Sequence, residues 1–449
     1  MKKWIFGSLL LLCSSFIGYQ MHLLLGIITG YAAKNMCSAV FISQRDEDSV
    51  RLIDLNFSPI CYAHTVVNYD NYLVESRLLW RCARAIYRPN CGACLVRDVS
   101  ADSLRRQKYP IEQERVADGV EELHYDTSHQ KEAREITHQL MSEHAYGGMP
   151  FAFVALWKGR LIAEGYKAGI DRDTRLLSWS MAKSMTNALT GIMVLEYDFD
   201  LYAPVNLPEW QHDERKQINV NDLLQMQSGL SWNENYGGVS DVIVMLHMAG
   251  DMAAYTIKKD ACCVPGKVFD YASGSTNVAS YVLRKALSND SLYYDLAVNK
   301  LFRKIGAKEV IFETDVTGTM LGSCYVYARA VDYARFGQLY MKDGVVGGER
   351  VLPEGWVRYT TTPATQSMGN YGSGFWLNTG GRYPLLERDV YSCEGHDGQF
   401  VVIVPSHDLV VTVLGFSPRK TNPLNIEMLV VDLIALVDKV PYKRDPTCL

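Results

Sequence analysis

The alternation of apolar and polar positions predicts strands in the middle and near the end of this 449-residue chain. Phe151–Trp157 is a β-rich apolar run, and Lys158-Gly159 turns the chain into a second strand that starts at Leu161. Two further strands, Phe400–Val404 and Leu409–Leu414, flank a short polar turn. Strands from both regions are expected to form one antiparallel sheet.

Helical spacing of apolar residues predicts the layers that cover this sheet. The predicted helices are Glu132–Ala145, Ser180–Glu196, Asn219–Gln227, Ala328–Met341 and Ile426–Val437, with a turn at Arg350–Trp356 leading into a short one. Ala39–Ile42 and Ala93–Val96 are expected as short strands, and Arg105–Glu122 as loop or solvated helix. The fold class is therefore α+β: an antiparallel β-sheet flanked by helices, plus an all-helical subdomain.

The amino-terminal segment is apolar from Trp4 to Ala33, after Lys2 and Lys3. A cleaved signal peptide, with an apolar run of about 7–15 residues, fits Trp4–Gly18. An uncleaved signal anchor needs about 20 apolar residues, which the longer stretch supplies if its two polar residues are tolerated. Bulky Tyr31 disfavours a cut after Ala33, so we favour the anchor. Either interpretation keeps the two lysines inside and exports the rest.

Composition narrows the classes of protein. The chain is 48% apolar and 21% charged, which is typical of a protein with a large core. Its net charge of −5 argues against a nucleic-acid partner, since binding phosphates needs a basic face. Export would allow some of the eleven cysteines to pair. Cys91 and Cys94 have CxxC spacing but no matching second pair, so no metal is expected.

Ser180 and Lys183 form an S-x-x-K motif. At the start of a helix, residues three apart share one face, which puts the amine beside the hydroxyl. A serine hydroxyl is a weak nucleophile that needs such a neighbouring base. The same spacing occurs at Ser128–Lys131 and Ser417–Lys420, but only Ser180 follows a predicted hairpin and opens a long apolar helix. The alternative for Ser180 is a helix N-cap.

Two later segments favour a catalytic role for Ser180 over the N-cap alternative. Tyr271 lies in a segment of small residues, Phe269–Asn277, where its hydroxyl could carry a proton; the alternative is a packing tyrosine. His396 lies in Cys393-Glu-Gly-His-Asp-Gly-Gln399, directly before the strand that starts at Phe400. Glycines there would let a substrate approach the strand backbone. The alternative for His396 is a turn histidine.

In this order, the three segments resemble the serine β-lactamase and penicillin-recognition superfamily. The resemblance is nearest to its class C-like branch, which includes esterases and 6-aminohexanoate-dimer hydrolases. The motifs here read Ser180-Met-Ala-Lys183, Tyr271-Ala-Ser273 and His396-Asp-Gly398. Neighbouring segments that also resemble the family include Leu223–Leu230, Ala328–Gly337 and Tyr371–Trp376. The resemblance covers about residues 136–440.

The resemblance implies roles for these residues and no cofactor. Ser180 would be the nucleophile, Lys183 the base or proton carrier, and Tyr271 the shuttle that protonates the leaving group. Backbone N–H groups of Ser180 and Gln399 would form the oxyanion hole. The residues expected to bind substrate are His396, Gly398, Gln399 and, from the segment Glu234-Asn-Tyr236 after Ser231-Trp232, Tyr236.

The sequence departs from the β-lactamase pattern at two positions. Ser273 stands where asparagine is typical, and His396 replaces the lysine of K-T-G. Both usual residues help to hold a β-lactam. Their loss favours an exported hydrolase of a small ester or amide acting through an acyl-enzyme on Ser180. The alternatives are a D-alanyl-D-alanine peptidase of the penicillin-binding type and a catalytically silent binding relative.

The expected organisation has four parts. Residues 1–33 form the signal anchor or signal peptide, 34–135 an amino-terminal extension, 136–440 the hydrolase domain and 441–449 a tail. The expected partners are a small ester or amide and, through the first segment, a membrane. The hydrolase domain is expected on the periplasmic side, tethered to the inner membrane. The number of copies in the assembly is left open.

Overall fold

The computed structural model describes residues 2–107, 109 and 123–439, with side chains from Ser14 onward. These residues form two compact units. The N-terminal unit comprises Met1–Lys108, Trp232–Thr256 and Thr314–Thr319, and the main unit comprises Tyr109–Ser231, Ile257–Glu313 and Met320–Leu449. The expected domain boundaries stay a prediction. The expected tail and residues 110–122 of the expected polar segment lie outside the described residues.

A six-stranded antiparallel sheet forms the centre of the main unit. Its strand order is β12-β13-β14-β15-β5-β6, so strands from the two distant regions of the chain pair as expected. β15 and β5 are neighbours, with Val411 opposite Ala155. The strands are β5 (Pro150–Trp157), β6 (Arg160–Tyr166), β12 (Trp376–Leu377), β13 (Tyr391–Gly395), β14 (Gln399–Val404) and β15 (Leu409–Gly415).

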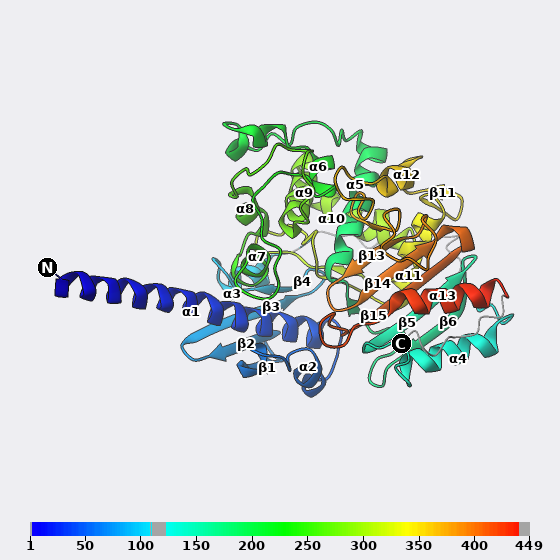
Figure 1. Cartoon of the computed structure of the whole chain (residues 1–449), viewed down its shortest axis with the longest axis horizontal. Helices are drawn as coiled ribbons and strands as arrows, with labels where there is room; N and C mark the ends of the chain where they lie inside the picture. The colour runs from blue at the N-terminus through cyan, green and yellow to red at the C-terminus, as the bar shows by residue number, and fades with distance from the viewer. Residues whose placement is uncertain (1, 108, 110–122, 440–449) are drawn as a thin grey trace. The chain divides into compact units, whose positions relative to one another are not determined.

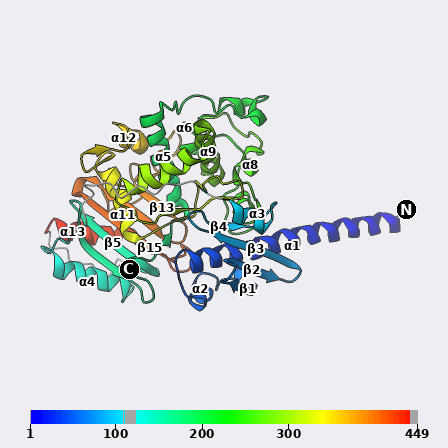
Figure 2. The same cartoon turned by 180° about the vertical axis from the view of Figure 1, so that it is seen from behind.

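Helices cover both faces of this sheet, which confirms the predicted α+β class (Figures 1 and 2). α4 (Gln130–Met141) and α13 (Ile426–Val437) lie on one face, and α11 (Ala330–Met341) packs on the other. α11 comes close to the strands because Gly337 has no side chain; a β-carbon there would lie 2.7 Å from methyl groups of Val401 and Val410.

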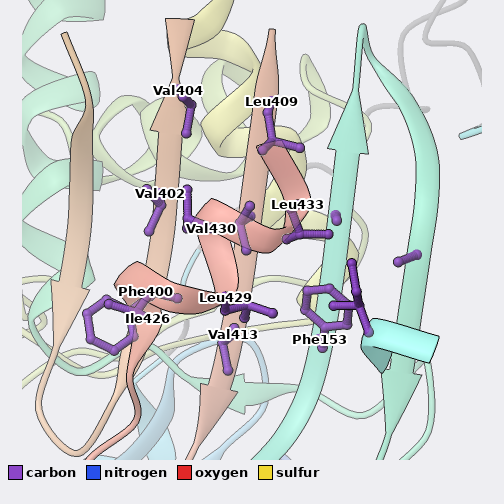
Figure 3. Close-up of a cluster of buried hydrophobic side chains, with 14 of the residues drawn as sticks. Phe153, Phe400, Val402, Val404, Leu409, Val413, Ile426, Leu429, Val430 and Leu433 are labelled. Atoms are coloured by element: carbon purple, nitrogen blue, oxygen red, sulfur yellow. The ribbon is translucent and has the colours of Figure 1, made fainter. Parts of the chain in front are cut away.

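The core between α13 and the sheet follows from the sequence of the helix. Asn425 caps it by accepting a hydrogen bond from the backbone of Met428. Apolar residues then recur at helical spacing and point at the strands (Figure 3). The buried contacts are made by Ile426, Leu429, Val430 and Leu433 against Phe153, Phe400, Val402, Val404, Leu409 and Val413.

The remaining elements of the main unit are mostly helical. They include α5 (Ala182–Tyr197), α6 (Val220–Leu224), α9 (Ser273–Leu287), α10 (Asp290–Asp295), the π-helix η5 (Leu296–Arg303) and α12 (Trp356–Thr361). A small sheet has the order β7 (Leu176–Leu177), β9 (Val326–Ala328), β8 (Ile311–Phe312), and β10 (Val345–Val346) pairs with β11 (Glu349–Arg350). α8 (Met252–Ile257) belongs to the N-terminal unit except for its last residue, with which the main unit resumes in the sequence.

The N-terminal unit places the long helix α1 (Lys2–Phe41) against a four-stranded antiparallel sheet (Figure 1). The strands are β1 (His64–Asn68), β2 (Leu73–Leu78), β3 (Arg81–Arg88) and β4 (Gly92–Leu95), and the other helices are α2 (Glu47–Ile53), α3 (Ala101–Arg106) and α7 (Asp241–Met248). β4 confirms the strand expected near Ala93. The strand expected at Ala39–Ile42 is wrong, because Ala39 and Val40 continue the buried stripe of α1 and its last turn stays helical.

Burial changes sharply along α1. Phe16, Ile17 and Tyr19 are about 60% exposed. From Leu25 onward nearly every residue is buried within this unit. Among the described residues one helix is long and apolar enough to cross a membrane, at Ser14–Phe41, and 83% of its most apolar window is buried in the protein. The second half of α1 is therefore a core helix.

Two glycines let α1 approach α7 closely. A β-carbon on Gly30 would collide with the carbonyl oxygen of His247, and one on Gly26 would lie 2.6 Å from the sulfur of Met248. The His247 ring is fully buried edge-on against Tyr31, with ring centroids 5.2 Å apart. Burial, and then the charges of Lys34 and Arg97, lower the pKa of His247 to about 3.

This shift predicts a pH-dependent stability. The folded pKa lies below the unfolded value of about 6.5, so the contribution of His247 is complete above pH 6.5 and is lost as pH falls towards 3. Between pH 7 and pH 5 the wild type should lose about 2 kcal/mol of unfolding free energy from this group. Urea unfolding of His247→Phe should lack that loss, whereas His64→Phe, at an exposed position, should retain it. An equal pH dependence in all three proteins would contradict the assignment.

Candidate active site

Ser180 projects from a tight turn between β7 and α5. Ser178 fixes the entry to this turn, because its backbone N–H donates to Val326 O (2.8 Å) and its hydroxyl accepts from Val326 N (3.0 Å). Trp179 then adopts a φ of +44°, a conformation that costs energy in a residue with a side chain. A 3₁₀ turn (Trp179–Met181) carries Ser180, and α5 follows at Ala182. Ser180 is half-buried at this helix start.

The amine of Lys183 lies beside the Ser180 hydroxyl. Lys183 is 1% exposed, one of the most buried lysines in the described chain. Its Nζ donates to Ser180 Oγ at 3.0 Å, Ser273 Oγ at 2.9 Å and the carbonyl oxygen of Ser323 at 3.0 Å. Each of the three hydrogen-bonding positions of the nitrogen therefore has an oxygen neighbour. The S-x-x-K spacing predicted the first contact; the other two come from distant segments.

Tyr271 packs its ring against this amine. Lys183 Nζ lies 4.9 Å from the centroid of the Tyr271 ring. The same ring stacks on Trp376, at 5.3 Å and 25°, and meets Tyr371 edge-on at 5.7 Å. Tyr271 precedes α9, whose first residue is Ser273, so the expected small-residue loop is half loop and half helix. The structure thus brings Tyr271 to Ser180 through Lys183.

The turn that contains His396 lies against the segment before Ser180. Gly395 ends β13, and a β-carbon there would collide with the carbonyl oxygen of Ser178. The rings of His396 and Trp179 meet edge-on, with centroids 5.6 Å apart. Gly398 adopts a φ of +84° in the same turn, which favours glycine. The whole segment Gly395–Gln399 therefore lies beside the Ser180 turn.

Gln399 holds this turn in place with its side chain. Its amide nitrogen donates to the carbonyl oxygens of His396 (3.0 Å), Asp397 (3.1 Å) and Gly415 (2.7 Å), and its amide oxygen accepts from Gly415 N. The side chain is thus committed to the turn. Its backbone pairs with Gly395 at the end of the β13–β14 ladder, and the predicted oxyanion role falls on that backbone.

Trp376 was not singled out as a site residue, although it ends the Tyr371–Trp376 segment that resembles the family. Its ring stacks on Tyr271 and lies 4.3 Å below the guanidinium of Arg382. Arg382 is held by the buried carboxylate of Glu394 (2.6 Å). The spacing of the chain gave no signal for these contacts, since they join residues from β12, β13, the loop between them and the segment before α9.

A buried polar network fixes α5 behind the site. The side-chain oxygen of Asn187 accepts hydrogen bonds from Tyr340 (2.6 Å) and Trp356 (2.9 Å). Ser184 donates to the carbonyl oxygen of Gly374 (2.6 Å), where a φ of +73° lets the loop approach α5. Because these groups are buried, each lost hydrogen bond would leave an unsatisfied partner. The network therefore holds the helix that carries Lys183.

The other two S-x-x-K serines have different surroundings. Ser128 Oγ donates to Asp126 and contacts His129 Nδ1. Ser417 Oγ accepts from the backbone N–H of Met149 (2.8 Å). Within the described part of the chain neither hydroxyl bonds the lysine of its own motif. The structure therefore distinguishes Ser180 from both.

Tyr236 belongs to the N-terminal unit. Its hydroxyl donates to Glu234 (3.1 Å), and the indole of Trp232 donates to the same carboxylate (2.6 Å). Its contact with substrate stays a prediction.

Comparison with known proteins identifies the family of the chain. A family model described as Beta-lactamase matches residues 133–421, more than half of the chain. A 6-aminohexanoate-dimer hydrolase of Paenarthrobacter ureafaciens is 26% identical over 295 residues, which cover 60% of this chain and 72% of that protein.

Solved structures share the fold. A Bacillus anthracis protein described as a candidate 6-aminohexanoate-dimer hydrolase is 19% identical with a TM-score of 0.59, covering 74% of this chain and 91% of that one. A penicillin-binding protein homologue from Caulobacter crescentus is 13% identical with a TM-score of 0.56, covering 71% and 99%.

Proposed function

We propose that this chain, which belongs to the beta-lactamase family of hydrolases, cleaves an ester or amide through a covalent acyl-enzyme on Ser180. The observation that carries the proposal is the 3.0 Å hydrogen bond between Lys183 Nζ and Ser180 Oγ at the start of α5. A nucleophile and a proton carrier within hydrogen-bond reach are what acyl transfer by serine requires.

In the proposed reaction, Ser180 Oγ attacks the carbonyl carbon of the substrate. Lys183 Nζ, neutral in the reactive form, accepts the hydroxyl proton and passes it on through the Tyr271 hydroxyl, and the C=O π electrons move to the oxygen of the tetrahedral intermediate. Collapse of the intermediate breaks the ester or amide bond, and Tyr271 returns the proton to the leaving alcohol or amine. Water then attacks the acyl-enzyme by the same route, releases the acid and restores the Ser180 hydroxyl.

The developing oxyanion needs two backbone donors. One is the N–H of Ser180 in the turn before α5. We propose that the second comes from the Gly395–Gln399 turn, which packs against Ser178 and Trp179. Gln399 is the donor implied by the motif.

The surroundings favour a small linear ester or amide over a β-lactam. Ser273, which replaces the usual asparagine, is engaged with Lys183 rather than free for a substrate amide (2.9 Å). His396 offers no permanent positive charge for a β-lactam carboxylate. The aromatic surfaces of Tyr271 and Trp376 suit an apolar substrate chain. The similarity to a 6-aminohexanoate-dimer hydrolase supports this substrate class.

Labelling by a fluorophosphonate probe tests the nucleophile. Wild type should be labelled at Ser180, and Ser180→Ala should not be labelled. Lys183→Met should reduce the labelling rate by about 10²–10⁴-fold, because the hydroxyl loses its proton carrier. Ser128→Ala and Ser417→Ala remove the serines of the other two S-x-x-K motifs and should be labelled like wild type. Equal labelling of wild type and Ser180→Ala would contradict the proposal.

Fluorescent penicillin separates the hydrolase from a penicillin-binding peptidase. We expect no long-lived adduct, because the lysine of K-T-G that would hold the drug carboxylate is absent. The measurement is in-gel fluorescence after a denaturing quench, with Ser180→Ala as background. A stable adduct confined to Ser180 would favour the peptidase.

We also propose that the protein is exported and keeps α1 as an anchor. Cleavage after Ala33 would remove Ile28, Ala32 and Ala33, which are buried in the core of the N-terminal unit. Deleting several buried apolar residues lowers the free energy of unfolding by more than the total stability of most domains. Among the described side chains before Leu24, Phe16, Ile17 and Tyr19 are about 60% exposed, and the stretch is apolar in sequence, so it is the part that suits a bilayer.

Two deletions test the anchor. Removal of residues 2–23 should release a folded protein into the soluble fraction, whereas removal of residues 2–33 should leave the N-terminal unit sensitive to limited proteolysis. The amino terminus of the membrane-bound protein, determined by mass spectrometry, should lie before Leu25. A mature protein that starts at Lys34 and resists proteolysis would contradict the anchor.

A further inference from the structure

Two arginines of the N-terminal unit pack against successive turns of α1. A β-carbon on Gly26 would lie 2.8 Å from Arg81 Nη2, and one on Gly30 would lie 3.1 Å from Arg97 Nη2. Residues four apart on a helix are separated by about 6 Å along its axis. The two guanidinium groups therefore lie on one face of α1, each filling the space that a glycine leaves. Arg81 begins β3, and Arg97 follows β4.

The two arginines have no ion-pair partner among the described residues. Within the described residues neither Arg81 nor Arg97 makes an ion pair within 4 Å, whereas Arg45, Arg51 and Arg84 of the same unit each pair with an acid. Arg97 Nη2 donates to the backbone oxygen of His247 (3.0 Å).

The pair also has unused hydrogen-bond donors. The Nε atoms of Arg81 and Arg97 are buried without a hydrogen-bond partner. Burial, and then the charge of Arg81, lower the pKa of Arg97, with Asp98 opposing them. Burying two like charges with unused donors destabilises the fold unless an anion binds to both of them.

The position of the two arginines along α1 indicates which anion could bind them. Residues 2–24 precede the buried part of the helix, and at 1.5 Å per residue they span about 35 Å. The hydrocarbon core of a bilayer is about 30 Å thick, and each headgroup layer adds about 5–8 Å. When the first part of α1 crosses the bilayer, Gly26 and Gly30 follow directly in the headgroup layer. The two guanidinium groups then lie at the depth of lipid phosphates.

We propose that Arg81 and Arg97 bind the phosphate of an anionic phospholipid headgroup at the point where α1 leaves the membrane. Guanidinium groups suit this ligand because each can donate two parallel hydrogen bonds to phosphate oxygens. The proposal rests on the proposed anchor and adds a lipid preference to it. The same donors could take free phosphate, so the test includes that source.

The test uses the full chain in detergent. Short-chain phosphatidylglycerol, short-chain phosphatidylcholine and inorganic phosphate are titrated in turn, and binding is followed by native mass spectrometry and the thermal midpoint. Wild type should retain phosphatidylglycerol and gain thermal stability from it. Arg81→Gln and Arg97→Gln should each weaken phosphatidylglycerol binding at least about tenfold, by loss of a charge-assisted pair. Arg106→Gln, which removes an equal charge at an exposed position, should bind like wild type.

Three results would overturn the proposal. Equal binding of the two lipids would remove the anionic preference, and equal binding by wild type and both glutamine variants would remove the site. Stabilisation by inorganic phosphate that matches phosphatidylglycerol would assign the site to free phosphate instead. If a glutamine variant does not fold, Arg81→Lys and Arg97→Lys replace it, and unchanged phosphatidylglycerol affinity in those variants contradicts the proposal. Fluorophosphonate labelling of Ser180 is measured in parallel, so that a lost lipid site is distinguished from a failed hydrolase assignment.

Discussion

The buried amine of Lys183 is the constraint on which the catalytic unit depends. A lysine that is 1% exposed has lost its water, and it is tolerated only because three oxygen atoms replace that water. The acceptors come from the Ser180 turn, from the start of α9 at Ser273, and from the chain around Ser323. These segments are far apart in sequence, so satisfying one amine brings together the parts of the candidate site. The aromatic face of Tyr271 closes the remaining side of the amine at 4.9 Å.

The same contacts explain why the sequence could predict part of the site. The Ser180–Lys183 contact follows from residues three apart at a helix start, which is a local rule. The strands β5, β6, β14 and β15 and the helix α13 were predicted because their apolar patterns are long and regular. The roles of Ser273, the Ser323 carbonyl and Trp376 are non-local. No spacing within one segment can indicate which distant oxygen satisfies an amine or which ring stacks on Tyr271.

The amino-terminal helix shows a second limit of sequence reasoning. Trp4–Ala33 is apolar throughout, and both a bilayer and a protein core favour that composition. Only the burial of Leu25 and later residues reveals that the second part of this apolar stretch belongs to a protein core. For the same reason Ala39–Ile42 resembles a strand in sequence but belongs to the end of a helix and the residue after it, since its packing partners decide its structure. Glycines at positions 26 and 30 mark where the helix meets α7 and the two arginines.

The central claim is that turnover passes through an ester bond to Ser180. Intact-protein mass spectrometry after rapid acid quench of wild type with a slowly hydrolysed p-nitrophenyl ester tests it most directly. The account predicts a transient mass increase equal to the acyl group, confined to the peptide that contains Ser180 and absent in Ser180→Ala. Turnover by Ser180→Ala at the wild-type rate, or an acyl group carried on another residue, would contradict it.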